Sequence, residues 1–540
     1  MDFELRYRIR NSNLVLNTTS ANSDVEICSE SKEKWYSLTV TAKQELVLDS
    51  ALLDSVFSIG KTDTFFMNGY QSWTDSKEMV LSENPTERNS NRIPRILRNI
   101  FAFDRYGDSV FYNYKSNTVH GYDVFYVKGK KSFFSFNRNS DTSFAIYEVN
   151  KDAGNLRIKS DIKGLSLKAG ESVKIFDLYL GSDYEEGLKE FKSYFNVGKK
   201  EKIIGYTSWY NHYQNINEDI ISRALDHMDK PFNLFQIDDG YETFVGDWTD
   251  VDPAKFPSGL KAIVSRIHEK GMKAGIWLAP FVAETKSRVY REHYDWILKD
   301  RDGKPSRCGS NWSGFYALDL RKEEVREYLK KCFDNFLSIG FDFFKLDFLY
   351  ASMIEEVEGY TRAQMARKSY SYLRSLVGDK IILGCGASCF PAYGLFDYMR
   401  IGPDVSLEFD DVWYMRHMHR ERVSTKTTLQ NTIYRSMFDT SLFGNDPDVV
   451  LLRDANIKLT PKQREALIMI NSLFGSVFMT SDDIGEYDDK KKGLLSRCLD
   501  VFQNAEEKSF ERKGNIITVT YVCHGKKESF SYHTQKGILL

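Results

Sequence analysis

Several kinds of segment are scarce or absent in this 540-residue chain, and each absence excludes a class of protein. The seven cysteines are scattered and lack the C-x-x-C pairs of zinc sites, so we expect free thiols in a reducing compartment. No apolar run approaches the ~20 residues that cross a membrane. The stretch Met1 to Val15 lacks the apolar centre of a signal peptide. We therefore expect a cytoplasmic protein without membrane contact.

An excess of positive charge is also missing. Lys and Arg number 74 against 76 Asp and Glu, which gives a net charge of −2, and no strongly basic tract stands out. A nucleic acid is therefore not expected as a partner, because its phosphates select for basic surfaces. Core material is plentiful, since hydrophobic residues make up 42% of the chain and aromatic residues 14%. At ~100 to 200 residues per domain, the length predicts two to four domains, or fewer if one is a barrel.

The pattern of the sequence changes near residue 200. Up to about Tyr184, short runs rich in Val, Phe and Tyr alternate with polar turns, as in SVFYNYKSNTVHGYDVFYVKGKKSFFSFNRNS. This pattern predicts an antiparallel β-sandwich. From about Lys202, short apolar strands alternate with amphipathic helices, which predicts βα units around a parallel sheet. The last residues contain NIITVTYV and ESFSYHT and predict a small β region.

Eight strand candidates follow one another after residue 200. They are IIGYTSWY at 203, FNLFQIDDGY at 232, MKAGIWLAPF at 272, FDFFKLDFLY at 341, KIILGCGA at 380, YMRIGPDV at 398, SLFGNDPDVVLL at 441 and GSVFMTSDD at 475. Eight repeats fit a (β/α)8 barrel better than an open sheet. The connecting helices are expected at 217–229, 258–270, 322–339, 361–377 and 460–474. The predicted domains are 1–190 for the sandwich, 200–498 for the barrel and 499–540 for the small C-terminal β region.

The stretch FDFFKLDFLY, residues 341–350, places Lys345 and Asp347 inside an otherwise apolar and aromatic run. Such a run predicts a strand buried on both faces, where an unpaired charge costs several kcal/mol. Residues i and i+2 of a strand share a face, so both side chains point the same way. A buried ion pair is one interpretation. A functional site at the end of the strand is the other.

Charged side chains gather at the ends of five of the expected strands, where the active residues of a barrel lie. They are Asp238 and Asp239, Lys345 and Asp347, Arg400 and Asp404, Asp446 and Asp448, and Asp482 and Asp483. A single aspartate at such a place is more often a helix cap or turn former, but five strands together favour a site. Tryptophans could add aromatic faces for the C–H patches of a sugar, although each could equally pack in the core. They are Trp209, Trp248, Trp277 and Trp312.

Paired carboxylates in a sugar pocket indicate glycoside hydrolysis, in which one attacks or activates water and the other protonates the departing oxygen. Asp347 suits the nucleophile, and Lys345 would hold it ionised, because a nearby positive charge lowers a carboxyl pKa. Asp404 suits the acid/base, since Gly402 and Pro403 favour a turn that projects its side chain inward. The carboxylates that compete for this second role are Glu408, Asp410 and Asp411.

Nine motifs support a resemblance to a known family. They are QIDDGYE, GDW, FP, GIWLAPF, YALDL, FFKLDFLYA, ILGCGA, MRIGPD and NDPD, in this order. In this set and order they closely resemble glycoside hydrolase family 36, the α-galactosidase family of the melibiase clan. The resemblance runs from about NGYQSW at 68 to SDD at 481. It is greatest with the short branch, whose members have a β-sandwich, a barrel and a small C-terminal β domain.

The resemblance implies an exo-acting α-galactosidase that hydrolyses terminal α-D-galactosyl residues of small galacto-oligosaccharides, with Asp347 as nucleophile and Asp404 as acid/base. The fourth and sixth strands are next-but-one neighbours, which favours the short carboxyl separation of a retaining enzyme. Neither a cofactor nor a metal is implied, and a homo-oligomer is left open. Substrate contacts are implied for Trp73, Asp238, Asp239, Trp277, Lys345, Cys385 and Arg400. Trp73 would reach from the sandwich over the sugar of its own or a neighbouring active site.

Departures from the family and rival functions remain. Larger members carry a tryptophan where Leu346 stands and a serine-aspartate pair where Gly402 and Pro403 stand, which disfavours long oligosaccharides. An α-N-acetylgalactosaminidase or an α-galactosyl transglycosylase of the same clan is the nearest alternative. A Schiff-base aldolase would use Lys345, but the adjacent Asp347 would keep that lysine charged. A sugar-binding protein without catalysis is the third alternative. The HMH stretch at 417–419 is not expected to bind a metal, because it lies in a charged segment.

Overall fold

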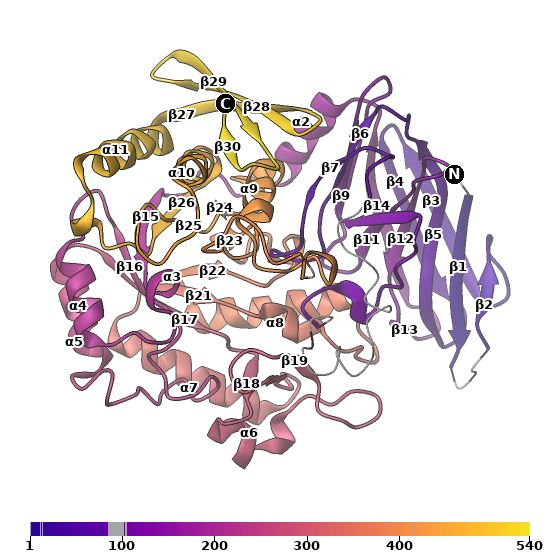
Figure 1. Ribbon diagram of the computed structural model, residues 1–540. Coiled ribbons are helices and arrows are strands. Elements are labelled where there is room, and N and C mark those ends of the chain that lie inside the picture. Colours follow the sequence, from indigo (N-terminus) through magenta and orange to yellow (C-terminus); the bar gives the residue numbers. More distant parts are fainter. Residues whose placement is uncertain (1, 11, 13, 85–101, 103–104, 414) are drawn as a thin grey trace.

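The computed structural model describes residues 2–10, 12, 14–84, 102, 105–413 and 415–540. Within these ranges the chain forms an N-terminal pair of antiparallel sheets, a central parallel barrel and a small C-terminal sheet (Figure 1). The predicted fold class is therefore confirmed. The N-terminus lies on the outer side of the sandwich, and the C-terminus lies beside α10 (Pro461–Phe474).

The two N-terminal sheets pack face to face around their own core. In β4 (Trp35–Ala42) every second side chain is buried, which is the period that a strand with one covered face requires. The first sheet has the order β2 (Leu16–Thr18), β1 (Asp2–Ile9), β5 (Leu46–Ser58), β12 (Asn155–Asp161), β11 (Phe144–Asn150) and β8 (Thr118–Tyr122), with β13 (Ser166–Leu167) also on β5. The second has the order β3 (Val25–Lys32), β4, β14 (Ser172–Gly181), β10 (Phe133–Asn137), β9 (Val124–Lys128), β6 (Thr64–Met67) and β7 (Lys77–Met79).

The barrel contains all eight predicted strands in the predicted order. They are β15 (Ile203–Thr207), β16 (Leu234–Ile237), β17 (Lys273–Leu278), β21 (Phe343–Leu346), β22 (Ile381–Gly384), β23 (Tyr398–Arg400), a seventh strand in two pieces, and β26 (Val477–Thr480). Their side chains are almost all buried, as expected for parallel strands covered on both faces.

The seventh strand closes the barrel although it is interrupted. Its first piece, β24 (Gly444–Asp446), pairs with β23, and its second piece, β25 (Val449–Val450), pairs with β26. Because β26 also pairs with β15, the ring is complete. The break falls at Pro447, which has no N–H to donate, and at Asp448, whose φ of 74° lies in the left-handed region. This break turns the side chains of Asp446 and Asp448 toward the neighbouring sixth strand.

All five predicted connecting helices are confirmed within a few residues. They are α4 (Glu218–Asp226), α5 (Gly259–Glu269), α7 (Glu323–Ile339), α8 (Arg362–Val377) and α10, the last two with capping boxes at Thr361 and Thr460. Within the described ranges, three further helices of at least ten residues were not predicted, α2 (Tyr184–Tyr194), α9 (Thr425–Tyr434) and α11 (Asp489–Asn504), and neither were two short ones, α3 (Trp209–His212) and α6 (Arg288–Glu292). Helix α2 spans residue 190 and α11 spans residues 498 and 499, where domain boundaries were predicted.

A buried arginine joins the sandwich to the barrel. Arg435, at the end of α9, is fully buried and donates hydrogen bonds from all three guanidinium nitrogens. On the sandwich side the acceptors are the Asn68 side chain and the carbonyls of Gly69, Gln71 and Ser72, at 2.6 to 3.3 Å. On the barrel side the acceptor is the carbonyl of Ile401, at 2.9 Å. These bonds fix the loop that carries Trp73 against the end of β23.

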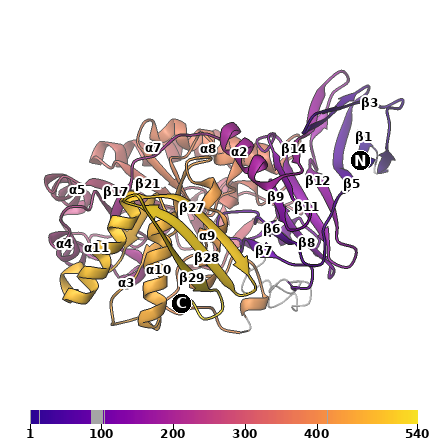
Figure 2. The ribbon, with the colours of Figure 1, turned by 90° about the horizontal axis from the view of Figure 1, so that it is seen from above.

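The C-terminal sheet covers one flank of the barrel. It consists of β27 (Ala505–Lys513), β28 (Ile516–Cys523), β29 (Lys526–His533) and β30 (Ile538–Leu539), in that order. It lies over α10 and α11, and Figure 2 shows it far from the outer edge of the sandwich. Among the described residues, every helix is too short or too polar to span a membrane.

Candidate active site

One cavity of about 230 Å³ opens at the carboxyl ends of the barrel strands. Seven of the nine predicted site residues line it: Trp73, Asp238, Asp239, Trp277, Lys345, Asp347 and Asp404. The other two, Cys385 and Arg400, lie directly behind this wall, in contact with Trp73 and Asp404 respectively. Residues from the sandwich and from five different strand ends therefore meet at one place.

Lys345 forms its ion pair with Asp238 rather than with Asp347. Its Nζ lies 2.9 Å from Asp238 Oδ2, and both side chains are buried. Asp238 Oδ2 also accepts hydrogen bonds from Thr207 and Gln236. Burial opposes the charged form of Lys345, but the carboxylate of Asp238 outweighs it and raises the lysine pKa above its usual value. A charged lysine cannot form a Schiff base, so this geometry argues against the aldolase alternative.

Asp347 is held by neutral donors on both oxygens. Trp277 Nε1 donates to Oδ2 at 3.0 Å, and the backbone N–H of Phe348 donates to Oδ1 at 2.9 Å. Burial raises the pKa of Asp347 above its usual value; the charge of Lys345 opposes this and that of Asp404 adds to it. Lys345 lowers the pKa of Asp347, as expected, but the effect of burial is larger, so the net shift of this pKa is upward.

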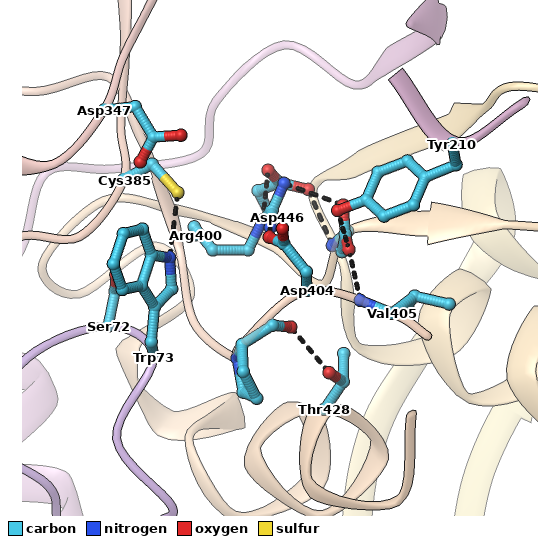
Figure 3. Close-up of polar contacts among 12 residues, drawn as sticks. Ser72, Trp73, Tyr210, Asp347, Cys385, Arg400, Asp404, Val405, Thr428 and Asp446 are labelled. Atoms are coloured by element: carbon cyan, nitrogen blue, oxygen red, sulfur yellow. Dashed lines mark hydrogen bonds and ion pairs between the residues drawn. The ribbon is translucent and has the colours of Figure 1, made fainter. Parts of the chain in front are cut away.

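Asp404 is held by a cation. Arg400 Nη1 lies 2.8 Å from Asp404 Oδ1, and the same guanidinium contacts Asp446 at 3.2 Å and Asp448 at 2.7 Å (Figure 3). The Arg400 side chain is only 3% exposed, whereas that of Asp404 is 34% exposed. The structure thus places Arg400 behind Asp404, surrounded by three carboxylates, and not in the cavity wall.

Asp448 connects this cluster to the first strand. Its Oδ2 accepts hydrogen bonds from the Tyr210 hydroxyl and from the backbone N–H of Val405, the residue after Asp404 (Figure 3). Burial raises the pKa of Asp448 to about 7; Arg400 opposes the rise, and the charges of Asp404 and Asp446 add to it. Tyr210 belongs to α3 (Trp209–His212), so the loop after β15 and the loop after β23 are tied together.

Trp73 reaches from the sandwich into the cavity of its own barrel. Its Nε1 donates to Cys385 Sγ at 3.1 Å, and its ring packs edge to face on Phe348 with centroids 5.1 Å apart. Burial raises the pKa of Cys385, with the charge of Asp347 adding, so the thiol stays protonated. Figure 3 shows Cys385 between the Trp73 ring and the Asp347 carboxylate. Cys385 therefore supports both side chains from behind.

Several lining residues were not assigned to the site from the sequence. Trp312, one of the tryptophans considered for an aromatic face, donates from Nε1 to Asp239 Oδ2 at 2.8 Å, and Gln214, which lies outside the cavity lining, contacts both oxygens of Asp239. Among the tryptophans singled out, Trp248 is fully buried against Trp277, outside the cavity lining, whereas Trp209 and Trp312 line the cavity. The remaining lining residues are Tyr106, Asn311, Phe348, Asp411, Met415, His419, Glu421, Arg422 and Val423. In the sequence, only the acidic stretch after Asp404 indicated that some of these remaining residues could lie at the site.

Metal ligands do not gather in the described part of the cavity. Within the described ranges, one group of three suitable side chains lies close enough to hold an ion, and it consists of Asp500, Cys523 and His524 on the C-terminal sheet. None of these lines the cavity. Of the HMH stretch, His419 lines the cavity and stacks on Tyr106 with centroids 6.0 Å apart.

Comparisons with known proteins agree with this geometry. Residues 182–380 match the family model for Melibiase. Alpha-galactosidase 1 of Pediococcus pentosaceus is 31% identical over 157 residues, which is 27% of this chain and 21% of that protein. The matched segments thus span about a fifth of the length of such curated relatives. The A type blood alpha-D-galactosamine galactosaminidase of Flavonifractor plautii is 27% identical over 212 residues.

Solved structures match over nearly the whole chain. An α-galactosidase from Thermus thermophilus, solved in complex with p-nitrophenyl alpha-D-galactopyranoside, is 25% identical with a TM-score of 0.71 and covers 93% of this chain and 98% of its own. The family 36 α-galactosidase AgaA of Geobacillus stearothermophilus, at 14% identity and a TM-score of 0.63, shows the same fold.

Fold, site and comparisons together show a (β/α)8-barrel protein whose residues 182–380 match the Melibiase family model. The predicted resemblance to the family 36 α-galactosidases is confirmed.

Proposed function

We propose that the protein is a retaining, exo-acting α-galactosidase that hydrolyses terminal α-D-galactosyl residues of small galacto-oligosaccharides. The observation that carries this proposal is the position of Asp347 and Asp404. They follow β21 and β23, which are separated by β22 alone, and both carboxylates line one small cavity with tryptophan and aspartate walls. Two carboxylates across a sugar-sized cavity are the minimal equipment for glycoside hydrolysis.

The reaction would proceed by double displacement. Asp347 attacks the anomeric carbon while Asp404 donates a proton to the leaving oxygen, and the glycosidic C–O bond breaks. Asp404 then removes a proton from water, which displaces Asp347 and releases galactose with its α configuration retained. Trp277 and the Phe348 N–H hold Asp347 in a fixed orientation throughout.

Galactose recognition would come from the aspartates after β16. We assign the axial C4 hydroxyl to Asp238 and Asp239, whose carboxylates line the cavity and are oriented by Lys345 and Trp312. A buried carboxylate without its hydroxyl partner is costly, so a glucoside should be rejected by several kcal/mol. The ring of Trp73 would cover the sugar, and the small volume supports binding of a single terminal ring.

The test is a panel of 4-nitrophenyl α- and β-glycosides, including the N-acetylgalactosaminide, with the released anomer followed by NMR. We expect turnover of the α-galactoside with α-galactose released first. Equal turnover of the α-glucoside, or β-galactose as the first product, would overturn the proposal. Preferred turnover of the N-acetylgalactosaminide would select the alternative of the same clan.

We further propose a cytoplasmic location, which the seven free thiols support. We also propose that the reaction needs neither a cofactor nor a metal. Sugars, rather than nucleic acids or membranes, would be the partners. The proposed domains are 1–190, 200–498 and 499–540. Size-exclusion chromatography would establish whether a homo-oligomer forms.

A further inference from the structure

A group of side chains with the chemistry of a metal site lies outside the cavity. Within the described ranges, Asp500, Cys523 and His524 form the one group in which three suitable ligand atoms all lie within 4.8 Å of one another. The three atoms are a carboxylate oxygen, a thiol sulfur and an imidazole nitrogen. This mixed set suits Zn²⁺, which accepts all three kinds of ligand, whereas Ca²⁺ and Mg²⁺ prefer oxygen ligands throughout.

The course of the backbone brings these three residues together. Helix α11 continues directly into β27, and Ala505, the first residue of β27, pairs with Cys523 at the end of β28. The end of the helix therefore lies beside the end of β28, and Asp500 lies about one turn before the helix ends. His524 follows Cys523 as the first of the two residues that join β28 to β29. The helix and the hairpin thus present their ligand atoms to one another.

The hairpin turn does not itself require a histidine. His524 and Gly525 have φ angles of 51° and 73°, both in the left-handed region. A two-residue turn with two positive φ angles most often contains Asn-Gly, so asparagine would be the usual residue at the first position. The histidine that stands there instead brings its Nε2 to 2.9 and 3.0 Å from the two carboxylate oxygens of Asp500.

The three side chains are oriented and accessible to an ion from solvent. Cys523 is a free thiol that is only 6% exposed, whereas the side chains of Asp500 and His524 are 49% and 59% exposed. Asn504 donates from Nδ2 to Asp500 Oδ1 at 2.8 Å, which orients the carboxylate. The zinc bond lengths of ~2.0 to 2.3 Å separate tetrahedral ligand atoms by ~3.3 to 3.8 Å. Small movements of the His524 ring and the Asp500 carboxylate would therefore admit the ion.

We propose that Asp500, Cys523 and His524 bind one Zn²⁺ ion, with a water molecule in the fourth position. Binding releases the proton of the Cys523 thiol, because the thiolate is the ligand, and His524 coordinates through Nε2 with its remaining proton on Nδ1. The ion ties α11 to the turn between β28 and β29. None of the three residues lines the cavity, so the role of this site is structural and the inference does not depend on the proposed α-galactosidase activity.

The experiment adds ZnCl₂ to the full chain after a chelator has removed any bound metal. Isothermal titration calorimetry should give one Zn²⁺ per chain, with Ca²⁺ and Mg²⁺ bound at least ~100-fold more weakly. Zinc at ~100 times its Kd should raise Tm by ~2 °C. Co²⁺ in place of Zn²⁺ should give a thiolate-to-cobalt charge-transfer band that Cys523→Ser abolishes. Turnover of 4-nitrophenyl α-galactoside should not depend on zinc.

The most informative variant is His524→Asn, because asparagine suits the turn and should leave the Tm of the metal-free protein unchanged. Zinc binding should weaken at least ~30-fold, since the loss of even an outer partner of a ligand costs ~10- to 100-fold. The matched control is His227→Asn. His227 also contacts an aspartate, Asp483, at 2.6 Å and has a side chain 48% exposed, but within the described ranges this pair belongs to no group of three ligands. The control should bind zinc as the wild type does.

Four outcomes would overturn the zinc site. They are a wild-type protein that binds no zinc, zinc binding that survives His524→Asn, an equal loss in His227→Asn, and a cobalt spectrum without the charge-transfer band. Each would leave the α-galactosidase proposal intact, because that activity is measured separately with the glycoside panel. Conversely, a protein that binds zinc as expected but cleaves no α-galactoside would retain the zinc site and lose the proposed activity.

Discussion

The two carboxylates of the cavity are supported in opposite ways. Asp347 is buried and receives hydrogen bonds from neutral groups, the Trp277 indole and the Phe348 N–H. Asp404 is one-third exposed and contacts a guanidinium that three carboxylates share. Neutral donors fix a nucleophile without taking its charge away, whereas a charged cluster can respond when a proton leaves or arrives. The difference matches the two roles proposed for these residues.

The strongest test of this comparison is removal of the fixed carboxylate. Asp347→Ala should lower kcat at least ~10⁴-fold with every leaving group, because no other group can form the covalent intermediate. Azide should restore part of the activity and give a β-galactosyl azide, since a small anion fits the vacated space. The measurements are steady-state kinetics and NMR of the product. A near-normal kcat would remove Asp347 from the nucleophile role.

Removal of the exposed carboxylate should have a smaller effect that depends on the substrate. Asp404→Ala should lower kcat/KM by ~10² to 10⁴-fold on a raffinose-type sugar, whose leaving oxygen needs a proton. The loss should be much smaller with a nitrophenyl leaving group, which departs without one. Kinetics on both substrates provide the comparison. Equal losses would direct attention to Asp411, the competing carboxylate that also lines the cavity.

The charged cluster itself can be altered without touching the cavity wall. Asp448→Asn keeps the shape but removes one of the three carboxylates around Arg400, so the charge of the cluster that holds Asp404 changes. We expect a loss of ~10-fold in kcat/KM on the raffinose-type sugar and a smaller loss on the nitrophenyl substrate, whose leaving group needs no proton. The matched control is Asp397→Asn, a partly exposed carboxylate outside the cavity lining. Equal losses on both substrates would reduce Asp448 to a structural residue.

The smallest expected effect concerns the neutral donors around Asp347. Because burial raises the pKa of Asp347, the acid limb of kcat/KM should lie above the pH at which an ordinary aspartate ionises, ~3.9. Trp277→Phe removes a hydrogen bond that favours the carboxylate, so the limb should rise further, by up to ~1 pH unit. A limb that falls instead would mean that Lys345, not the indole, dominates the charge state of Asp347.

Strand and helix patterns sufficed for the barrel, while the cavity could be anticipated only in part. The hydrophobic period and the Gly and Pro residues between the segments of 203–480 specify eight strands, and the motifs at the ends of some of these strands specify part of the cavity wall. Helix α9 escaped prediction because TKTTLQNTIY is rich in β-branched threonine and its residues are mostly buried, so no amphipathic period exists. The partner of Lys345 escaped prediction because Asp238 lies 107 positions away, and spacing along one strand cannot reveal a contact between strands.

The part of Val423 in the cavity wall, and the position of Trp209 relative to Asp404, could not be deduced from the sequence for a related reason. Both residues reach the cavity through loops whose course depends on tertiary contacts, such as the bond from Tyr210 to Asp448. Aromatic and apolar residues in a loop carry no periodic signal, so their position relative to Asp404 emerges only from the fold.

The buried Arg435 makes the N-terminal sheets an obligatory part of the barrel. Its positive charge has carbonyl and amide oxygens as hydrogen-bond partners, four of them from the loop Asn68–Ser72. A barrel produced without the sandwich would leave these guanidinium donors without their acceptors and would lack Trp73. Removal of the sandwich would therefore destabilise the barrel and open its cavity. The sandwich and the barrel should therefore unfold as one cooperative unit. A chimera of two related proteins would have to take both domains from the same parent.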